Sequence, residues 1–433
     1  MKTSNFDKIT YEEVISSLKR DFALRESILT KEAVNFSGNV DLPIHRWFYY
    51  KEAFSSRLIT GFISELPQKK NLKILDPFSG VGTTLLESKF SEIESVGFDI
   101  NPVADFICKV KCSNYSENDI KFAEKYFQTF NENVELSENI PPYKMFDELF
   151  SHGVRSDMLK IKGFYERCIN KKISSLIKLV YLSLIGKYAN RIKDGNGLKI
   201  RKNYNPPESI LPIFLETLYS FYEDLISTNA SGISKRFEPR NIQGSIIEED
   251  KFSKIKNELF DGVIFSPPYP NCFDYLEVYK LELWLGDFIT SFKDLRPMRD
   301  VMVRSAVNCM FNVEVENSYE EVEYLAYRLE RAGVWNERIP AMLRGYYDDM
   351  AKVLKRIYSV TRKGAPVHII VANSCYKEFI IPTDAIFCRI AADIGFEVIG
   401  IDRVRQIRAS SQQMKLIGND AELMRESIVK LKR

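Results

Sequence analysis

The stretch Phe265-Ser266-Pro267-Pro268-Tyr269 constrains the fold of this chain more than any other. It follows the short apolar run 261–264, which is typical of a buried strand in a parallel sheet. Two consecutive prolines end the strand in a stiff, extended turn, because each fixes its own φ and biases the residue before it away from helix. The carboxyl end of the strand therefore presents a hydroxyl, rigid carbonyls and an aromatic ring, where open α/β sheets bind ligands.

These groups suit the chemistry of an exocyclic amine on a nucleobase. Such an amine is a poor nucleophile, because its lone pair is delocalised into the ring. The Ser266 oxygen and the Pro267 carbonyl can accept its two N–H hydrogens and draw the nitrogen toward tetrahedral geometry. Tyr269 can stack on the base and hold it outside a duplex. A plain turn after a strand is the structural alternative, since proline pairs are common turn signals.

The same residues resemble the catalytic motif of the S-adenosylmethionine-dependent DNA amino-methyltransferases, which is (Asp/Asn/Ser)-Pro-Pro-(Tyr/Phe). Ser-Pro-Pro-Tyr is the form most often met in the cytosine-N4 enzymes of that family. The resemblance implies that Ser266, Pro267, Pro268 and Tyr269 are the catalytic residues. Cytosine-C5 chemistry would need a Pro-Cys pair, which the sequence lacks, so Cys272 is not required as a nucleophile.

A second motif lies near the amino terminus. Residues 72–76 predict a strand, 77–84 a glycine-containing turn and Leu85 the start of a helix, a design that brings backbone N–H groups close to a nucleotide-type cofactor. A Walker lysine and a third Rossmann glycine are both missing, which favours S-adenosylmethionine over ATP or NAD. This segment resembles the first motif of the same family, although a purely structural turn is the alternative. The expected cofactor-binding residues here are Asp76, Phe78, Ser79, Gly80, Gly82, Thr83 and Thr84.

Further cofactor contacts are expected on two other strands and on an aromatic segment. Residues 95–99 predict a strand whose terminal Asp99 can accept hydrogen bonds from both ribose hydroxyls, with a helix cap as the alternative role. By resemblance, Ile100 and Asn101 follow the ribose site, and Ser245 and Ile246 lie beside the adenine after a strand at 240–247, with Ser245 where the family often has Asp. By the same resemblance, Trp47 in the aromatic segment 43–51 closes over the methionine end, unless that segment is only a packing patch.

Helical periodicity dominates between the second and third predicted strands, over a distance far longer than a βα crossover needs. We therefore expect N-terminal helices and the first half of the core in 1–102, a helical insertion for target recognition in 103–239, and the second half of the core in 240–433, with a smaller insertion at about 293–339. The insertion carries a basic stretch, which predicts phosphate contacts unless it is a solvated helix face. Its cations are Lys160, Lys162, Arg167, Lys171, Lys172, Lys178, Lys187, Arg191, Lys193, Lys199, Arg201 and Lys202. A second basic group, Arg403, Arg405 and Arg408 with Ser410, Ser411 and Gln412, either faces DNA or is ordinary surface.

Composition excludes several classes of protein. The net charge of +2 over 433 residues requires any nucleic-acid face to be a local patch. No stretch approaches the roughly 20 apolar residues of a membrane span, and the amino terminus lacks a signal-peptide core. Seven scattered cysteines and three dispersed histidines predict a cytoplasmic protein with reduced thiols and no metal site.

Together these features predict an α/β, class I methyltransferase-like (Rossmann-like) fold, with a mostly parallel seven-stranded sheet and a large helical insertion. The expected function is methyl transfer from S-adenosylmethionine to the N4 amine of cytosine in DNA, within a restriction-modification system. The expected partners are double-stranded DNA with a flipped target base and a separately encoded restriction endonuclease. Three alternatives stay open: adenine-N6 methylation of DNA, methylation of an RNA base amine, and a module that binds cofactor and DNA without catalysis.

Overall fold

The structure is a computed structural model and describes residues 3–29, 31–131, 133–142, 144–195, 197–230, 237–309, 314–407 and 416–433. Its strands are β1 (Leu24–Glu26), β2 (Lys73–Asp76), β3 (Glu94–Asp99), β4 (Arg191–Asp194), β5 (Gly197–Ile200), β6 (Arg240–Gln243), β7 (Gly262–Phe265), β8 (Pro366–Ala372), β9 (Ser374–Tyr376), β10 (Phe379–Ile381), β11 (Glu397–Gln406) and β12 (Arg425–Lys432).

The α-helices are α1 (Tyr11–Asp21), α2 (Ser56–Ser64), α3 (Thr83–Phe90), α4 (Pro102–Cys112), α5 (Glu117–Phe127), α6 (Phe146–Leu149), α7 (His152–Arg167), α8 (Lys171–Tyr188), α9 (Leu211–Ala230), α10 (Glu249–Phe252), α11 (Tyr275–Val278), α12 (Lys280–Leu285), α13 (Leu295–Val301), α14 (Glu320–Ala332), α15 (Ile339–Val360) and α16 (Thr383–Ile394). Short 3₁₀ helices are η1 (Thr3–Lys8), η2 (Lys31–Val34), η3 (Phe36–Asn39), η4 (His45–Trp47), η5 (Phe292–Asp294) and η6 (Gly418–Leu423).

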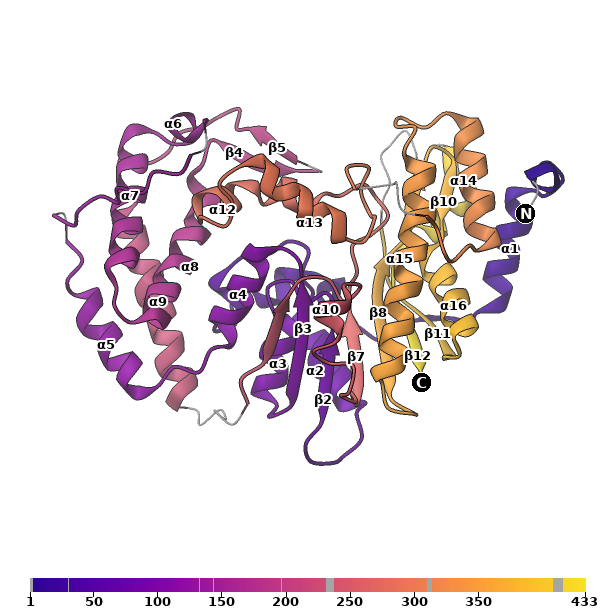
Figure 1. Cartoon of the computed structure of the whole chain (residues 1–433), viewed down its shortest axis with the longest axis horizontal. Coiled ribbons are helices and arrows are strands. Elements are labelled where there is room, and N and C mark those ends of the chain that lie inside the picture. The colour runs from indigo at the N-terminus through magenta and orange to yellow at the C-terminus, as the bar shows by residue number, and fades with distance from the viewer. Residues whose placement is uncertain are drawn as a thin grey trace.

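A single eight-stranded sheet in the order β1-β11-β12-β8-β7-β2-β3-β6 forms the centre of the molecule (Figure 1). All neighbours pair in parallel except β12, which is antiparallel to both β8 and β11. The sheet and its helices confirm the α/β, class I methyltransferase-like fold. It has one strand more than expected, because β1 lies in the N-terminal part of the chain, where we expected helices before the core. Helix α1 ends at Asp21, where the chain becomes extended, and the exposed β1 pairs with the edge of β11.

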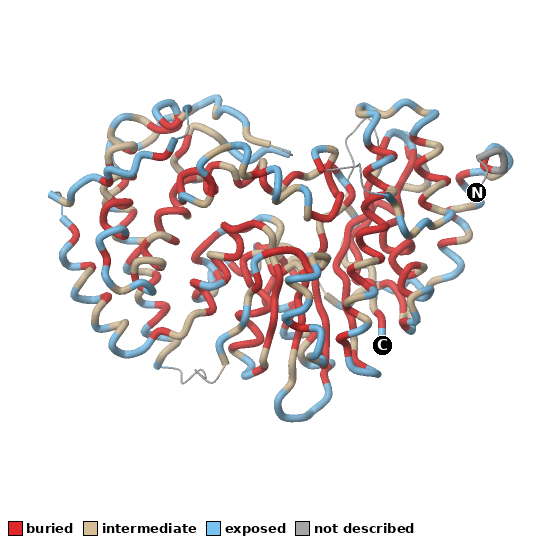
Figure 2. The backbone as a smooth tube through the Cα atoms, in the orientation of Figure 1, coloured by how far each residue is buried: buried red, intermediate tan, exposed pale blue. Residues whose placement is uncertain are grey.

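The two faces of the sheet pack against different helices, as the alternation of side chains in strands requires. On one face, Ile74, Ile264, Ile370 and Ile428 share a hydrophobic cluster with α2. On the other face, the neighbouring residues of the same strands join a cluster with α15 and α16. Figure 2 shows buried residues running along the strands, while exposed residues lie on the outer sides of the surrounding helices and in the loops. Both faces are therefore covered, as expected for a parallel sheet.

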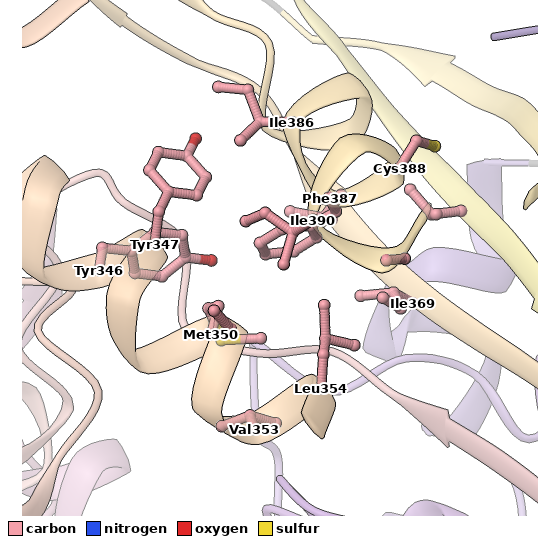
Figure 3. Packing of buried hydrophobic residues seen from close by; sticks show 14 of the residues in the cluster. Tyr346, Tyr347, Met350, Val353, Leu354, Ile369, Ile386, Phe387, Cys388 and Ile390 are labelled. Carbon is pink, nitrogen blue, oxygen red and sulfur yellow. The ribbon is translucent and has the colours of Figure 1, made fainter. Parts of the chain in front are cut away.

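Helices α15 and α16 form the largest part of the second face. Tyr346, Tyr347 and Met350 of α15 lie opposite Phe387 and other apolar residues of α16 (Figure 3). The Tyr347 ring meets the Phe387 ring at a centroid distance of 6.2 Å, nearly edge-on, and the Tyr347 hydroxyl donates a hydrogen bond to Thr383. Helix α16 in turn contacts β8, β11 and β12, so the packing of α15 against α16 covers this part of the sheet.

A separate hydrophobic cluster holds the helical insertion together. Helix α4 packs against β3 and β6 and is the crossover helix of the sheet. Helices α5, α7, α8 and α9 follow it and gather at one side of the sheet, on the left in Figure 1. The same cluster includes residues of α11 and α12, which follow the Ser266–Tyr269 turn. The insertion thus contacts the core at two places near the carboxyl ends of the strands.

Within the described residues, no helix is both long enough and apolar enough to cross a membrane.

A buried carboxylate on α9 ties the insertion to the aromatic segment before α2. Asp224 is 3% exposed and accepts hydrogen bonds from the Ile44 backbone, the Arg46 guanidinium and the Trp47 indole. The Trp47 ring also stacks on Phe221, with centroids 4.9 Å apart. These bonds fix the path of the chain that leads to Tyr50.

We predict that replacing Asp224 by Asn lowers the free energy of unfolding by about 3–5 kcal/mol, because the amide removes the buried negative charge and one of the two oxygens that accept from Ile44, Arg46 and Trp47. Thermal and urea denaturation measure the change. The control is Glu223→Gln, an exposed position on the same helix, which should leave stability nearly unchanged. Equal, small effects of both substitutions would show that Asp224 does not anchor this segment.

Candidate active site

A cavity of about 300 Å³ opens where β2, β3 and β7 end at their carboxyl side. This volume lies at the lower end of the range of small-molecule sites. Most of the residues predicted from the sequence line it: Phe78, Ser79, Gly80, Thr83, Asp99, Ile100, Asn101, Ser245, Ser266, Pro268 and Tyr269. The structure thus brings the two sequence motifs into one cavity, although Lys73 at the start of β2 and Asp261 before β7 are 188 positions apart.

The glycine-containing turn is shaped by Asp76, which lies beneath the cavity and does not line it. Asp76 is fully buried and accepts hydrogen bonds from the Thr84 hydroxyl at 2.5 Å and the Phe78 backbone at 3.0 Å. Burial raises the pKa of this carboxyl to about 7. The hydrogen bonds of Asp76 therefore stabilise the turn from outside the cavity lining.

The two glycines of this turn have different roles. Gly80 has a φ of +51° and lines the cavity, where a Cβ would lie 3.8 Å from the ring of Tyr50. Gly82 has a φ of +84°, and a Cβ there would lie 2.5 Å from the Cys108 sulfur on α4. Gly80 therefore keeps the cavity open, whereas Gly82 permits close packing of α3 against α4 and lies outside the lining.

Asp99 is held as a preorganised acceptor at the end of β3. Its two carboxylate oxygens accept hydrogen bonds from the Gly80 backbone at 2.9 Å and the Asn101 backbone at 2.8 Å. Burial raises the pKa of Asp99 to about 7. Each oxygen keeps a lone pair for a hydroxyl in the cavity. Nearby, the buried side-chain nitrogen of Asn101 has no hydrogen-bond partner among the described residues, as expected where a ligand supplies an acceptor.

The turn after β6 contributes one of its two predicted residues. Gly244 has a φ of +133° and turns the chain so that Ser245 lines the cavity. Ser245 is fixed by its backbone bond to Glu248. Ile246 is 1% exposed and belongs to the hydrophobic cluster under α15, so it lies outside the lining.

The aromatic segment reaches the cavity through Tyr50 and not through Trp47. Trp47 is 1% exposed and is held by Asp224 and Phe221, away from the cavity. Tyr50 lines the cavity and stacks on Tyr279 of α12, with ring centroids 4.7 Å apart. Tyr279 in turn bonds Glu52, and Lys193 of β4 lies 3.4 Å above its ring. The sequence identified the segment, but burial decides which of its aromatic residues faces the ligand.

The Ser266–Tyr269 turn forms the wall of the cavity at the end of β7. Ser266, Pro268 and Tyr269 line it, while Pro267 is buried behind them. The Tyr269 hydroxyl lies 3.2 Å from the Ser266 hydroxyl and donates a hydrogen bond to Glu426 of β12 at 3.0 Å. Glu426 and its partner Arg405 also line the cavity. No short-range sequence pattern pointed to Glu426, because it lies 157 positions after Tyr269.

Cys272 has a structural environment. It is 5% exposed, and its sulfur lies near the Met342 sulfur and the Tyr376 hydroxyl. Burial raises the pKa of its thiol, which disfavours the nucleophilic thiolate. His368 on β8 is buried and lies 3.2 Å from Glu65. Both residues therefore serve packing.

A second cavity of about 410 Å³ adjoins the first on the side of the insertion, and Lys51, Glu52 and Phe273 line both. The end of α8 and the β4–β5 hairpin supply Lys187, Arg191 and Lys193.

Several other cations of the predicted basic stretch have internal partners. Lys162 is fully buried against Asp287, and Arg201 donates to the carbonyls at the end of α8.

In the second predicted basic group, four residues lie outside the described part of the chain: Arg408, Ser410, Ser411 and Gln412.

The lining fits S-adenosylmethionine. The paired acceptors of Asp99 suit a ribose diol, Tyr50 and Phe78 offer apolar surface, and the free amide nitrogen of Asn101 suits an acceptor atom. Gly80 leaves the space beside Tyr50 that a side chain would reduce.

Several known proteins with similar sequences are methyltransferases. No family model matches the chain. Type II methyltransferase M.BsoBI of Geobacillus stearothermophilus is 27% identical, over 92% of this chain and 87% of the relative. M.AvaI of Nostoc sp. is 25% identical, over 90% of this chain and 86% of the relative. M.MvaI of Kocuria varians is 23% identical, over 79% of each chain. Both are also named type II methyltransferases.

Among solved structures, the rRNA methyltransferase aviRa of Streptomyces viridochromogenes is 11% identical over 89% of each chain, with a TM-score of 0.30 that is too low to support an argument.

The similarity to the first two relatives covers about nine tenths of the chain, so it includes most of the insertion as well as the core on both sides of it. The chain is therefore a homologue of the type II methyltransferases, with the motifs of the DNA amino-methyltransferases and S-adenosylmethionine as its methyl donor.

Proposed function

We propose that this protein methylates the N4 amine of cytosine in DNA, as the modification enzyme of a restriction-modification system. The observation that carries the proposal is the shared cavity of Ser266, Tyr269 and Asp99. A serine in the first position of the Ser-Pro-Pro-Tyr motif supports cytosine-N4, and the type II methyltransferase relatives support a DNA substrate.

The proposed chemistry relies on positioning and electrostatics. When bound, S-adenosylmethionine would supply an electrophilic methyl group attached to its sulfonium sulfur. The amine nitrogen forms a bond to the methyl carbon as the carbon–sulfur bond breaks. Ser266 accepts one N–H hydrogen of the amine and so localises the nitrogen lone pair. The Pro267 carbonyl is the proposed acceptor for the second hydrogen, and because Pro267 is buried behind the lining, the base must enter deeply enough to reach it. Tyr269 and Pro268 bound the space for a flipped base, and the surplus proton leaves to solvent. No covalent enzyme intermediate is required.

We place the DNA backbone along the second cavity, next to the first cavity in which the target base is proposed to bind. Lys51 and Lys187 are exposed, line this cavity and are suited to phosphate contacts. Tyr49 is 63% exposed and lines the same cavity, where it can stack on a base. A separately encoded endonuclease that cleaves the unmodified site would complete the system.

We predict that Ser266→Ala lowers kcat about 100- to 1000-fold, because it removes a preorganised hydrogen-bonding group from the amine. The assay follows transfer of a labelled methyl group to unmodified bacterial DNA, with mass analysis of the nucleosides. The unaltered protein should yield N4-methylcytosine. The control is Ser253→Ala, an exposed position between α10 and β7, which should retain full activity.

N6-methyladenine as the product would replace the proposal by the adenine alternative, and methylation of RNA in preference to DNA would replace it by the RNA alternative. DNA binding without any methylation would identify a recognition module. Unchanged activity of Ser266→Ala would refute the catalytic scheme.

We predict that Asp99→Asn weakens S-adenosylmethionine binding about 10- to 100-fold, because the amide cannot accept hydrogen bonds from both ribose hydroxyls on both of its atoms. Isothermal titration calorimetry measures the dissociation constant. In the unaltered protein the affinity should fall as the pH drops through about 7, where burial places the pKa of Asp99 and protonation removes an acceptor. Glu94→Gln, at the opposite end of β3, is the matched control and should bind normally.

We predict that combined Lys51→Gln and Lys187→Gln substitutions weaken DNA binding and reduce its salt dependence. Each lost phosphate contact should lower the slope of log K against log salt by about 0.9, with little effect on sequence preference. Fluorescence anisotropy over a salt series measures the slope. Lys171→Gln, at the other end of α8, should leave it unchanged. Equal slopes for the double variant and the unaltered protein would exclude this face as the DNA path.

A further inference from the structure

Glu426 closes a chain of hydrogen bonds behind the proposed catalytic serine. It lies on β12, is 4% exposed and accepts a hydrogen bond from the Tyr269 hydroxyl at 3.0 Å. The Tyr269 hydroxyl lies 3.2 Å from the Ser266 hydroxyl. The other Glu426 oxygen accepts a hydrogen bond from Arg405 at 2.6 Å. The chain Ser266–Tyr269–Glu426–Arg405 thus runs from the wall of the cavity across two strands.

The backbone places Arg405 opposite Glu426 in a direct cross-strand pair of β11 and β12. The register of this pair shifts between Arg403 and Arg405, as at a β-bulge. Bulges re-aim side chains and often occur beside active sites. Arg403, before the shift, pairs instead with Glu26 of β1 at the sheet edge. The register shift thus coincides with the orientation of the Arg405 side chain toward Glu426 and the cavity.

The number of protons on these groups decides which group donates and which accepts in each hydrogen bond of this chain. An ionised carboxylate only accepts hydrogen bonds, so the Tyr269 hydroxyl must donate its single proton to the bond with Glu426. The Tyr269 oxygen can then only accept, and the proton between the two hydroxyls must come from Ser266. With its proton turned away from the cavity, the Ser266 oxygen offers only lone pairs to a ligand.

This direction matters for an amine nucleophile. A serine whose proton is free can donate it to the nitrogen lone pair, which is the pair needed for attack on the methyl group. A serine whose proton is held by Tyr269 can only accept an N–H hydrogen and leaves that lone pair exposed.

We propose that Glu426 is a positioning residue for methyl transfer, which orients the Ser266 hydroxyl through Tyr269 so that Ser266 acts as a hydrogen-bond acceptor toward the target amine. The inference rests on the proposed function, since it explains how the same serine is oriented. It adds a residue that the Ser-Pro-Pro-Tyr motif does not contain.

The ionisation of Glu426 gives the proposal a pH signature. Burial raises the pKa of the Glu426 carboxyl above its ordinary value, and the Arg405 guanidinium and the Tyr269 hydroxyl offset only part of that rise. These two groups, from β11 and from the turn after β7, face the carboxylate from the elements packed against it. Protonation would allow Glu426 to donate to Tyr269 and reverse the chain. Activity that depends on the ionised form is present above the pKa of Glu426 and is lost as the pH falls through it.

The test compares Glu426→Gln, Tyr269→Phe and the double variant in the methylation assay. Glutamine keeps the shape but can donate from its nitrogen, so kcat should fall about 10- to 100-fold while the S-adenosylmethionine dissociation constant stays within about twofold. Tyr269→Phe, which keeps the buried charge pair with Arg405, should lower kcat to a similar extent. The double variant should be no worse than the more affected single variant, because both changes interrupt one chain. The acid limb of the pH–kcat profile that belongs to Glu426 should be absent from Glu426→Gln.

A matched control is Glu26→Gln, which removes the carboxylate partner of Arg403 on the same sheet without contact with the cavity. It should retain normal kcat and the normal pH profile. Full activity of Glu426→Gln, an additive loss in the double variant, or an unchanged acid limb would each overturn the role of Glu426, provided that the unaltered protein methylates DNA. Failure of the unaltered protein to methylate DNA would overturn the proposed function itself. If Glu426→Gln does not fold, normal kcat of Tyr269→Phe would still refute the chain.

Discussion

Parallel pairing of β3, β2 and β7 is the constraint on which the site depends. Parallel strands end at the same edge, so Asp76, Asp99 and Phe265 arrive together although they are far apart in sequence. Each strand then leads into a different structure at this edge, namely a glycine turn after β2, a carboxylate acceptor at the end of β3 and a proline-stiffened wall after β7. The register of the pairs is specified by burial on both faces, because a shift by one residue would exchange the cluster under α2 with the cluster under α15.

The insertion supports this site from outside: among the described residues, none from 103–239 lines the first cavity, but several contact the residues that position it. Asp224 on α9 holds the segment that delivers Tyr50, and Lys193 on β4 lies over Tyr279, on which Tyr50 stacks. The hairpin beside the proposed DNA path thus contacts Tyr279, the aromatic side chain on which the cavity-lining Tyr50 stacks. The long helical interval between β3 and β6 begins after α4, which packs against both of these strands.

The sequence predicted those parts of the fold that have strong local patterns. Strands β2, β3 and β7 are found almost where the apolar runs and turn residues indicated. Edge and antiparallel strands were harder: β1 is exposed along its length, and β12 mixes charged and apolar residues, so neither has the continuous apolar run of a buried parallel strand. Among the predicted site residues, Gly80 and Asp99 line the cavity, but the sequence did not reveal that Gly82 faces Cys108 or that Trp47 faces Asp224. Glu426 depends on a cross-strand pairing that only the folded sheet creates.

The most direct measurement of the central claim is a crystal structure of the protein with S-adenosylhomocysteine and a DNA duplex that contains its target. The predicted result has the ribose hydroxyls on Asp99 and an extruded cytosine with its amine nitrogen within about 3 Å of the Ser266 oxygen. A cofactor bound away from Asp99, or a target base that remains stacked in the duplex and remote from Ser266, would contradict it.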